Sequence, residues 1–384
     1  MIAQIFHCED TSLLRYLSKK YSYDFQSNTQ NFLLEIRTVQ TNHFNESKIF
    51  LEEFIPNKRL LFVKDINQNY DLIFRIDSLS LLKEKILELK IVKSNLLLEE
   101  ILVKINNYFN TPQFLIGEKI FSFDKPYLMG IVNVTPDSFS DGGKYFSEDS
   151  AVAHAIEMID DGVDIIDVGG ESSRPGSEPV SAEEEMNRVI PVIKKILDNK
   201  PEAIISVDTY KSSVAKAALE TGAKIINDIS GFSFDPGIAD VCAQYNATAI
   251  LMHIKGTPKT MQLNPAYDEI ISEIYDFLKK QIDYAQSRGV TKIIIDPGIG
   301  FGKTVEDNFT IHKRLKDFKS LGCPLLIGVS RKSLIGKTLN LEVDQRDLPT
   351  AALEAVAILN SARIIRTHNV KNGKQIIKLL SEII

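Results

Sequence analysis

One local pattern recurs three times in the second half of the chain and restricts the fold more than any other feature. A helical segment ends at a glycine, and a short β-branched strand follows that ends in a carboxylate or an amide. The pattern occupies residues 160–170, 220–231 and 287–298, with Gly162, Gly222 and Gly289 at the joints. Glycine is favoured after a helix because the left-handed backbone there would make a Cβ clash. Helices that lead directly into strands are typical of parallel sheets.

Extending this pattern along the chain predicts eight short apolar strands separated by helices. The strands are 128–132, 164–168, 203–207, 224–226, 248–252, 292–295, 324–328 and 363–365. The helices include 150–160, 182–197, 212–220, 270–288, 306–318, 350–360 and 371–384. Eight such units predict a (β/α)8 barrel. An open doubly wound sheet is the alternative, but NVTPDSFSDGG stands where its glycine-rich phosphate fingerprint would follow the first strand.

The composition changes near residue 110, because Gly117 is the first glycine of the chain. The preceding segment contains candidate strands and helices that predict a small mixed α/β domain. The strands are 32–39, 59–63 and 70–76, and the helices are 81–89 and 97–105. We expect an N-terminal extension over residues 1–115 and the barrel over residues 116–384. The extension carries no chemical motif, which favours a structural or interaction role.

Charge and hydropathy exclude several classes of protein. The 45 basic and 51 acidic residues give a net charge of −6, which provides no overall field to attract nucleic acid or an anionic membrane. An anionic ligand must therefore be held by a local site. No apolar run approaches the length of a transmembrane helix, and charged residues interrupt the N-terminus early, which predicts a cytoplasmic protein. The three widely spaced cysteines suggest neither a disulfide framework nor a zinc site.

Polar side chains follow every predicted strand, at the barrel end where active sites of this fold lie. In chain order they are Asn133, Asp167 with Glu171 and Arg174, Asp208, Asn227 with Asp228, His253, Asp296, Ser330 with Arg331 and Lys332, and Arg366 with His368. Any one of them could instead cap a helix or form a turn. Their presence at all eight strand ends favours a site for a polar heterocycle and an anion.

Chemistry divides these residues into two groups. Asp208, Asn227 and Asp296 offer oxygen acceptors, which suit a ligand edge with several N–H donors. Lys332, Arg366 and His368 offer donors or positive charge, which suit phosphate oxygens or ring acceptors. Asn133 could help to hold Mg²⁺ on a diphosphate. The loops 133–150 and 169–185 are long for such connections and are predicted to act as lids.

Eight strings of residues resemble, in order, the motif set of the dihydropteroate synthase family. They are GIVNVTPDSFSDGG (130–143), DVGGESSRPG (167–176), SVDTYK (206–211), INDISG (226–231), LMH (251–253), DPGIGFGK (296–303), GVSRKS (328–333) and IIRTHNV (364–370). The resemblance spans about residues 127–384. It implies a pterin-binding (β/α)8 barrel that joins 4-aminobenzoate to a dihydropterin diphosphate, releases diphosphate, and serves folate biosynthesis.

The resemblance also implies roles for individual residues. Asp208, Asn227, Asp296 and Lys332 match the residues that hold the pterin ring, and Met252 and Phe301 would line its apolar surroundings. Asn133 matches an asparagine associated with Mg²⁺. Arg366 and His368 match the pair that binds diphosphate, and Arg174, Ser173 and Ser333 match positions near diphosphate and 4-aminobenzoate. Asp141 would approach the incoming amine. The resemblance implies a homodimer and sensitivity to sulfonamides.

Small departures from the family pattern surround these motifs. Ser173 stands where threonine is common, and Thr367 and Asn369 stand where the family often has valine and aspartate. A negative charge next to His368 from a neighbouring residue is therefore in doubt. Two alternatives remain at this stage: a methyltetrahydrofolate-dependent methyltransferase, which would not use the SRKS and RTH motifs, and a non-catalytic pterin-binding protein, which would be expected to have broken motifs.

Overall fold

The computed structural model describes residues 1–7, 11–22, 32–55, 60–64, 69–89, 95–135 and 148–383. Packing divides the chain into two compact units. The first unit contains Met1–Thr111 together with Asp268–Asp276 and Arg314–Gly322. The second unit contains Pro112–Tyr267, Phe277–Lys313 and Cys323–Ile384.

The second unit is built on a closed barrel of eight parallel strands. They are β7 (Tyr127–Asn133), β8 (Ile165–Gly169), β9 (Ile205–Asp208), β10 (Ile225–Asp228), β11 (Thr248–Met252), β12 (Ile293–Asp296), β13 (Leu325–Ile327) and β14 (Ala362–Thr367). The barrel closes where β14 pairs with β7, with Ile364 opposite Tyr127. Each predicted strand overlaps one of these eight, so the (β/α)8 prediction is confirmed and the open doubly wound sheet is excluded.

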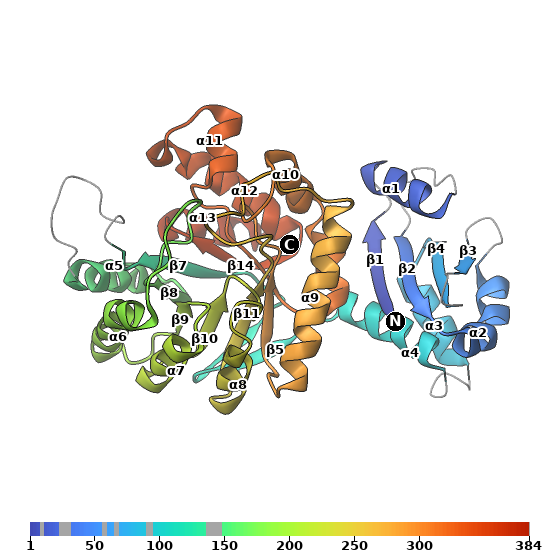
Figure 1. Ribbon diagram of the computed structural model, residues 1–384, viewed down its shortest axis with the longest axis horizontal. Coiled ribbons are helices and arrows are strands. Elements are labelled where there is room, and N and C mark those ends of the chain that lie inside the picture. The colour runs from blue at the N-terminus through green and yellow to red at the C-terminus, as the bar shows by residue number, and fades with distance from the viewer. Residues whose placement is uncertain are drawn as a thin grey trace. The chain divides into compact units, whose positions relative to one another are not determined.

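Helices surround the strands on the outside of the barrel (Figure 1). They are α5 (Glu148–Asp160), α6 (Ala182–Asn199), α7 (Ser212–Thr221), α8 (Gly237–Gln244), α9 (Ile270–Ser287), α10 (Val305–Lys313), α11 (Ser333–Leu339), α12 (Asp347–Leu359) and α13 (Val370–Leu380). The predicted joint glycines Gly162, Gly222 and Gly289 have φ angles of 87°, 122° and 93°. Glycine therefore ends these helices in the backbone conformation that the sequence predicted.

The predicted helix 306–318 is wrong in its second half. Helix α10 ends at Lys313, and a 3₁₀ helix, η4 (Leu315–Leu321), follows it. Arg314 lies between them with φ −106° and ψ 22°, outside the α-helical region. Its buried guanidinium is paired with Glu269 and Asp317. This tertiary pairing accompanies the break, and periodicity alone gave no sign of it.

A β-hairpin covers the N-terminal end of the barrel. It consists of β5 (Gln113–Ile116) and β6 (Lys119–Ser122). Ile116, Phe121 and Phe123 are buried against apolar residues of the strands, including Met129 of β7 and Ile364 of β14. The carboxyl ends of the strands are therefore the ends that remain available for a ligand, as is usual in this fold.

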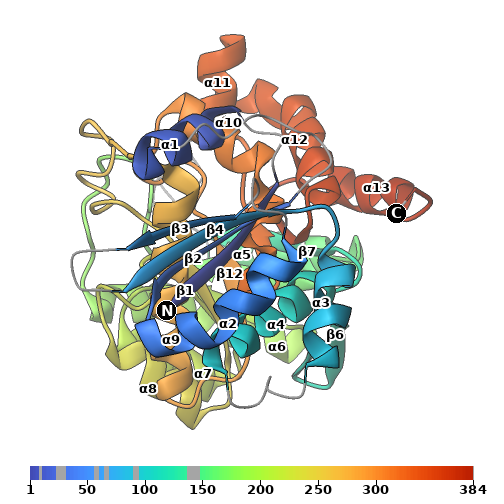
Figure 2. The same cartoon turned by 90° about the vertical axis from the view of Figure 1, so that its right-hand side faces the viewer.

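The first unit contains a four-stranded antiparallel sheet with the order β1-β2-β4-β3. The strands are β1 (Ile2–His7), β2 (Phe32–Val39), β3 (Leu60–Lys64) and β4 (Tyr70–Ile76), and the helices are α1 (Thr11–Tyr21), α2 (Thr41–Phe54), α3 (Leu79–Glu88) and α4 (Leu96–Phe109). Apolar residues of β1, β2 and β4 form one buried cluster with residues of α2, α3 and α4. Figure 2 shows α1 and α2 on opposite sides of the sheet. The predicted mixed α/β fold of this region is confirmed.

Candidate active site

Side chains at the ends of β8, β9 and β10 are linked to Arg366, which lies near the end of β14. Arg366 donates from Nε to Asp167 Oδ2 over 2.6 Å and from Nη2 to Asp208 Oδ2 over 2.8 Å. Asn227 donates from Nδ2 to the same oxygen of Asp167 over 3.0 Å. The ends of β8, β9, β10 and β14 are thus joined by one network of charged and amide groups.

Burial and neighbouring charges shift the pKa values of Asp208 and Arg366 in this network. Burial raises the pKa of Asp208 to about 7, Arg366 opposes the rise, and Asp167 adds to it. Burial would lower the pKa of Arg366, but Asp167 and Asp208 outweigh burial and raise the pKa. Asp167 is fully buried, and its Oδ1 has no hydrogen-bond partner among the described residues. The network therefore holds one fixed cation and a carboxylate that can gain or lose a proton near neutrality.

Sequence reasoning placed Asp167 at a strand end but gave it no role. The structure makes it the acceptor that holds both Arg366 and Asn227 in place. Its position in the DVGG string, two residues before the Gly169 that lies opposite Asp208, was the signal that could have identified it.

A second group lies at the ends of β12 and β13. Lys332 Nζ lies 4.8 Å from the centre of the Phe301 ring and donates to the carbonyl oxygen of Ile299. Asp296 Oδ1 accepts a hydrogen bond of 2.7 Å from the Gly298 amide. Burial raises the pKa of Asp296, with Lys332 opposing, and burial lowers the pKa of Lys332 to about 8, with Asp296 opposing. The two groups therefore stabilise each other's charged forms.

The two groups share one electrostatic environment at the barrel mouth. Arg366 influences the pKa of both Asp296 and Lys332, and Asp208 influences that of Lys332. Asp208, Asn227, Asp296, Lys332 and Arg366, which the sequence assigned to one site, are therefore brought together rather than scattered over the surface.

Asn133 lies beside the first group. It ends β7 and pairs with Gly169 of β8, which in turn is opposite Asp208 of β9. A Cβ on Gly169 would lie 3.4 Å from Asp208 Cβ and 3.9 Å from Asn133 Oδ1. Gly169 therefore leaves room for both side chains to lie close to each other, and the Asn133 oxygen is available near the mouth.

His368 is held next to the strand ends as an uncharged ring. Its backbone amide donates to Ser330 Oγ over 3.2 Å, and its Nδ1 lies 3.0 Å from the same oxygen. Burial is the main cause that lowers the pKa of His368 to about 3, and the nearby Arg366, Arg331 and Arg174 act in the same direction. At neutral pH, His368 is therefore a hydrogen-bonding group and not a cation.

Apolar and loop residues complete the surroundings. Met252 forms a buried cluster with Ile229 and Ile254, and Phe301 packs against it. Ser173 lines a narrow recess together with Asp208. Arg174 is exposed on the same loop. Asp141 and most of the first predicted lid lie outside the described residues.

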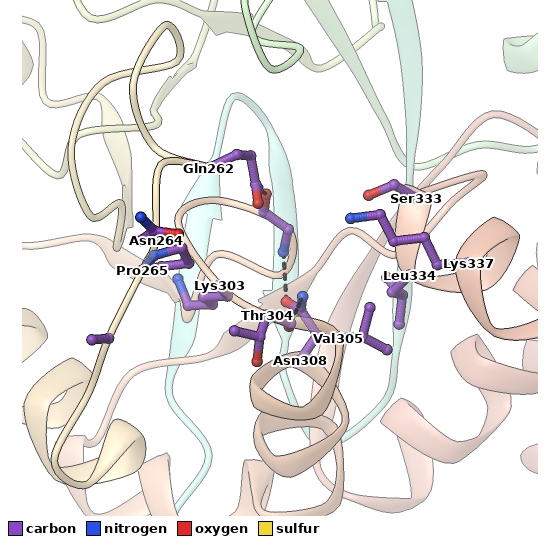
Figure 3. Close-up of a pocket in the computed structure, with 12 residues that line it drawn as sticks. Gln262, Asn264, Pro265, Lys303, Thr304, Val305, Asn308, Ser333, Leu334 and Lys337 are labelled. Carbon is purple, nitrogen blue, oxygen red and sulfur yellow. Dashed lines mark hydrogen bonds between the residues drawn. The ribbon is translucent and has the colours of Figure 1, made fainter.

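Ser333 lines a larger cavity of about 460 Å³ (Figure 3). The cavity is bounded by the segment around Gln262, by the segment from Gly300 to Asn308 and by helix α11. Gly300 also touches the site, because a Cβ there would lie 3.2 Å from Lys332 Cδ. Gly300 therefore borders both the cavity and the group that contains Lys332.

Several strand-end residues have structural roles instead. Arg331 forms a two-bond pair with Asp347, with distances of 2.6 and 2.9 Å. Asp228 accepts hydrogen bonds from Ser230 and Phe232 and so forms its own turn. Arg331 and Asp228 therefore have the structural role that the sequence left open as an alternative for polar residues at strand ends.

The comparisons with known proteins agree with this geometry. Residues 129–368 match the family model described as pterin binding enzyme. The chain is 45% identical over 280 residues to the dihydropteroate synthase of Synechocystis sp., covering 72% of this chain and 96% of that protein. It is 46% identical to the corresponding enzyme of Bacillus subtilis over 67% of this chain and 88% of the relative.

Solved structures give the same result. A dihydropteroate synthase from Yersinia pestis in complex with a sulfonamide drug aligns with a TM-score of 0.67 and 37% identity, over 71% of this chain and 98% of that one. A dihydropteroate synthase from Xanthomonas albilineans with 7,8-dihydropteroate aligns with a TM-score of 0.64 and 36% identity, over 71% and 98%.

The chain therefore belongs to the pterin-binding enzyme family of (β/α)8 barrels. Within that family it is a dihydropteroate synthase, a transferase of folate biosynthesis that condenses 4-aminobenzoate with dihydropterinylmethyl diphosphate. The resemblance found in the sequence motifs is confirmed.

Proposed function

We propose that the strand-end residues divide the two substrates between them. Asp208, Asn227 and Asp296 accept hydrogen bonds from N–H groups on the edge of the pterin, and Lys332 donates to its ring acceptors. Met252 and Phe301 pack against its faces. The observation that carries this proposal is the electrostatic coupling of Asp208, Arg366, Lys332 and Asp296 at one barrel mouth.

The diphosphate lies on the cationic side of the mouth in this proposal. Arg366 and Arg174 supply positive charge, and the uncharged His368 supplies a hydrogen bond. Charge on these groups stabilises the diphosphate as its bond to the pterin CH₂ breaks. The electron-rich pterin ring takes up the positive charge left on the CH₂, and the ionised forms of Asp208 and Asp296 stabilise that charge.

The residues at the mouth fit a magnesium ion that arrives with the diphosphate. Within the described residues, no cluster of three or more His, Cys, Asp or Glu could hold a metal alone. Asn133 offers one neutral oxygen beside Asp208, which suits an ion that takes its other ligands from phosphate and water. Mg²⁺ bound there would neutralise charge on the leaving diphosphate.

We place 4-aminobenzoate next to the pterin CH₂, with Ser173, Arg174 and Ser333 around it. Its amine nitrogen forms the new C–N bond after diphosphate has left and then releases a proton to solvent. The uncharged amine needs no strong base for this step. A solved Xanthomonas albilineans relative with 4-aminobenzoic acid supports this choice of substrate, with a TM-score of 0.67 and 37% identity.

Asp296→Asn tests the pterin assignment. The amide loses an acceptor for ring N–H groups, so we expect kcat/KM to fall by about a hundredfold, as for a buried hydrogen-bond partner that is lost. The matched control is Asp240→Asn, which removes an exposed ion pair with Arg288. Full turnover of 4-aminobenzoate by the Asp296 variant would show that the pterin lies elsewhere.

We also propose that the enzyme acts as a cytoplasmic homodimer, with residues 116–384 as the catalytic domain and residues 1–115 as a non-catalytic extension. Within the described part of the chain, no helix is long and apolar enough to cross a membrane. Exposed apolar side chains lie on α10 and α12, at Phe309, Leu348, Val356 and Leu359. Sedimentation of the wild type and of Val356→Glu tests this proposal: a dimer should dissociate in the variant, and a monomeric wild type would refute it.

A further inference from the structure

Lys303 is a buried lysine in the connection between β12 and α10. Its side chain is only slightly exposed, and its Nζ lies 3.0 Å from His253 Nδ1, 3.3 Å from the His253 carbonyl oxygen and 3.0 Å from the Phe301 carbonyl oxygen. These three acceptors are uncharged, and they come from two different connections. Lys303 therefore joins the residues after β11 to the residues after β12.

The two connections approach each other more closely than side chains would allow. Gly298 has φ +73°, and a Cβ there would lie 1.9 Å from the His253 carbonyl oxygen. Gly302 has φ +67°, and a Cβ there would lie 2.4 Å from the Lys255 carbonyl oxygen. Glycine permits this contact at both positions, and the hydrogen bonds of Lys303 cross it.

The segment that Lys303 holds carries two groups that position Lys332. The carbonyl oxygen of Ile299 accepts from Lys332 Nζ, and the ring of Phe301 lies under the same nitrogen. Lys303 binds Phe301 directly through its carbonyl oxygen. A shift of this segment would therefore move Lys332 relative to Asp296.

We propose that Lys303 is a positioning residue: by tying Phe301 to His253, it holds the segment 297–303 in the shape that directs Lys332 and Phe301 at the pterin. This inference rests on the proposed pterin site. It assigns the role to a side chain that does not itself touch substrate.

Charge gives Lys303 a second effect on the same site. Burial lowers the pKa of Lys303 to about 7, and Asp296 opposes that change. In return, Lys303 lowers the pKa of Asp296, as Lys332 and Arg366 also do. The other charged groups that act on Lys303 are Lys332, Asp307 and Lys255, and His253 is in direct contact. In mildly acidic solution, the charged Lys303 thus helps to keep Asp296 ionised.

Lys303→Met tests the proposal because it keeps the length of the side chain and removes its N–H donors. We expect the KM for dihydropterin diphosphate to rise about tenfold, the equivalent of one buried hydrogen bond. The KM for 4-aminobenzoate should change by less than about twofold on the same scale. Without the charge of Lys303 the pKa of Asp296 rises, so the pH at which pterin affinity falls in acid should move to a higher value. A lower free energy of unfolding would not cause this shift.

Lys337→Met is the matched control. Lys337 lines the same cavity as Lys303 but lies exposed on α11 (Figure 3). Its kinetics should equal those of the wild type. If Lys303→Met does not fold, His253→Phe removes one acceptor of Lys303 and should raise the same KM by a smaller factor.

The outcomes separate this inference from the proposed function. Suppose that the wild type binds dihydropterin diphosphate, but that the folded Lys303→Met variant, or His253→Phe in its place, has an unchanged KM and an unchanged pH dependence of pterin affinity. Lys303 is then not a positioning residue, and the proposed pterin site is unaffected. If calorimetry detects no binding of the pterin to the wild type, the proposed function itself fails.

Discussion

Arg366 links the ends of three strands at the barrel mouth. It is the cation between Asp167 and Asp208, and its loss would leave two largely buried carboxylates without a positive partner. For Arg366→Met we expect kcat/KM to fall by at least about a hundredfold and the free energy of unfolding to fall by about 3 kcal/mol.

Arg363→Met is the control for this change. Arg363 lies on the same strand, but it donates to the carbonyl oxygens of Ile358 and Ala362. Steady-state kinetics and urea unfolding of both variants check the prediction. Wild-type kinetics in Arg366→Met would mean that this residue contributes to neither substrate binding nor catalysis.

The directions of the Arg331 and Lys332 side chains could not be predicted from the sequence. Arg331 and Lys332 follow the same strand, and both were predicted at the mouth. Arg331 has φ +55° and turns to Asp347, whereas Lys332 lies over Phe301. The sequence identified the strand end correctly, but the direction of each side chain depends on a backbone angle that composition and motif do not specify.

At the scale of elements, Asp347 at the start of α12 joins the connections that follow β13 and β14. It accepts from Arg331, which precedes Lys332, and from Asn369 Nδ2 over 3.0 Å, which follows His368. Position 369 holds Asn where the family often has Asp, but Asp347 of α12 supplies a negative charge nearby. Asp347 raises the pKa of His368, against the larger effects of burial and the arginines.

Asp347→Ala should therefore disturb both connections together. We expect kcat/KM to fall by about tenfold, since two charge-assisted hydrogen-bonded contacts are lost. Asp344→Ala, at an exposed position of the preceding 3₁₀ helix η5 (Val343–Arg346), is the control. Equal kinetics in the two variants would contradict the role given to Asp347.

Helix α12 also carries a buried carboxyl group that makes stability depend on pH. Glu354 is almost fully buried, and burial raises its pKa from 4.5 to about 7. Between these values the folded protein binds more protons than the unfolded chain, so this contribution is present at low pH and is lost as pH rises towards 7.

Glu354→Gln should remove that dependence. The difference in unfolding free energy between wild type and variant should change by up to about 3 kcal/mol between pH 4.5 and pH 8. Urea unfolding at both pH values measures it. Parallel stability curves would show that the pKa of Glu354 is the same in the folded protein and in the unfolded chain.

The elements themselves were predictable to different degrees. The strands of the barrel were found because each is a short apolar run between a glycine joint and a polar end. Helices α8 and α11 span eight and seven residues, too short to show a clear helical period, and they were missed. The break at Arg314 depends on partners distant in sequence.

At the scale of the whole molecule, the first unit is not made by residues 1–111 alone. Tyr275 donates from its hydroxyl to the Ala3 carbonyl oxygen over 2.9 Å, and Arg37 makes two bonds of 2.6 Å to Asp276. Asp317 accepts from the backbone amide of His7 over 3.2 Å. Segments far apart in the sequence thus complete one packed unit, as composition alone could not indicate.

Deletion of residues 1–111 should therefore destabilise the remaining chain. Tyr275 is fully buried, and the deletion would expose it and leave its hydroxyl without the Ala3 acceptor. We expect a fall in Tm of at least about 5 °C, in line with the loss of one or two kcal/mol. Calorimetry of the truncated and full-length proteins checks this. An unchanged Tm would show that the first unit contributes nothing to the stability of the rest.

The central claim is that the pterin ring lies among the carboxylates, amide and lysine at the ends of β9, β10, β12 and β13. A crystal structure with a bound pterin tests it most directly. The ring edge should be hydrogen-bonded to Asp208, Asn227 and Asp296, with Lys332 at its acceptor side. A pterin found instead in the cavity beside Lys337, with those four side chains untouched, would contradict the account.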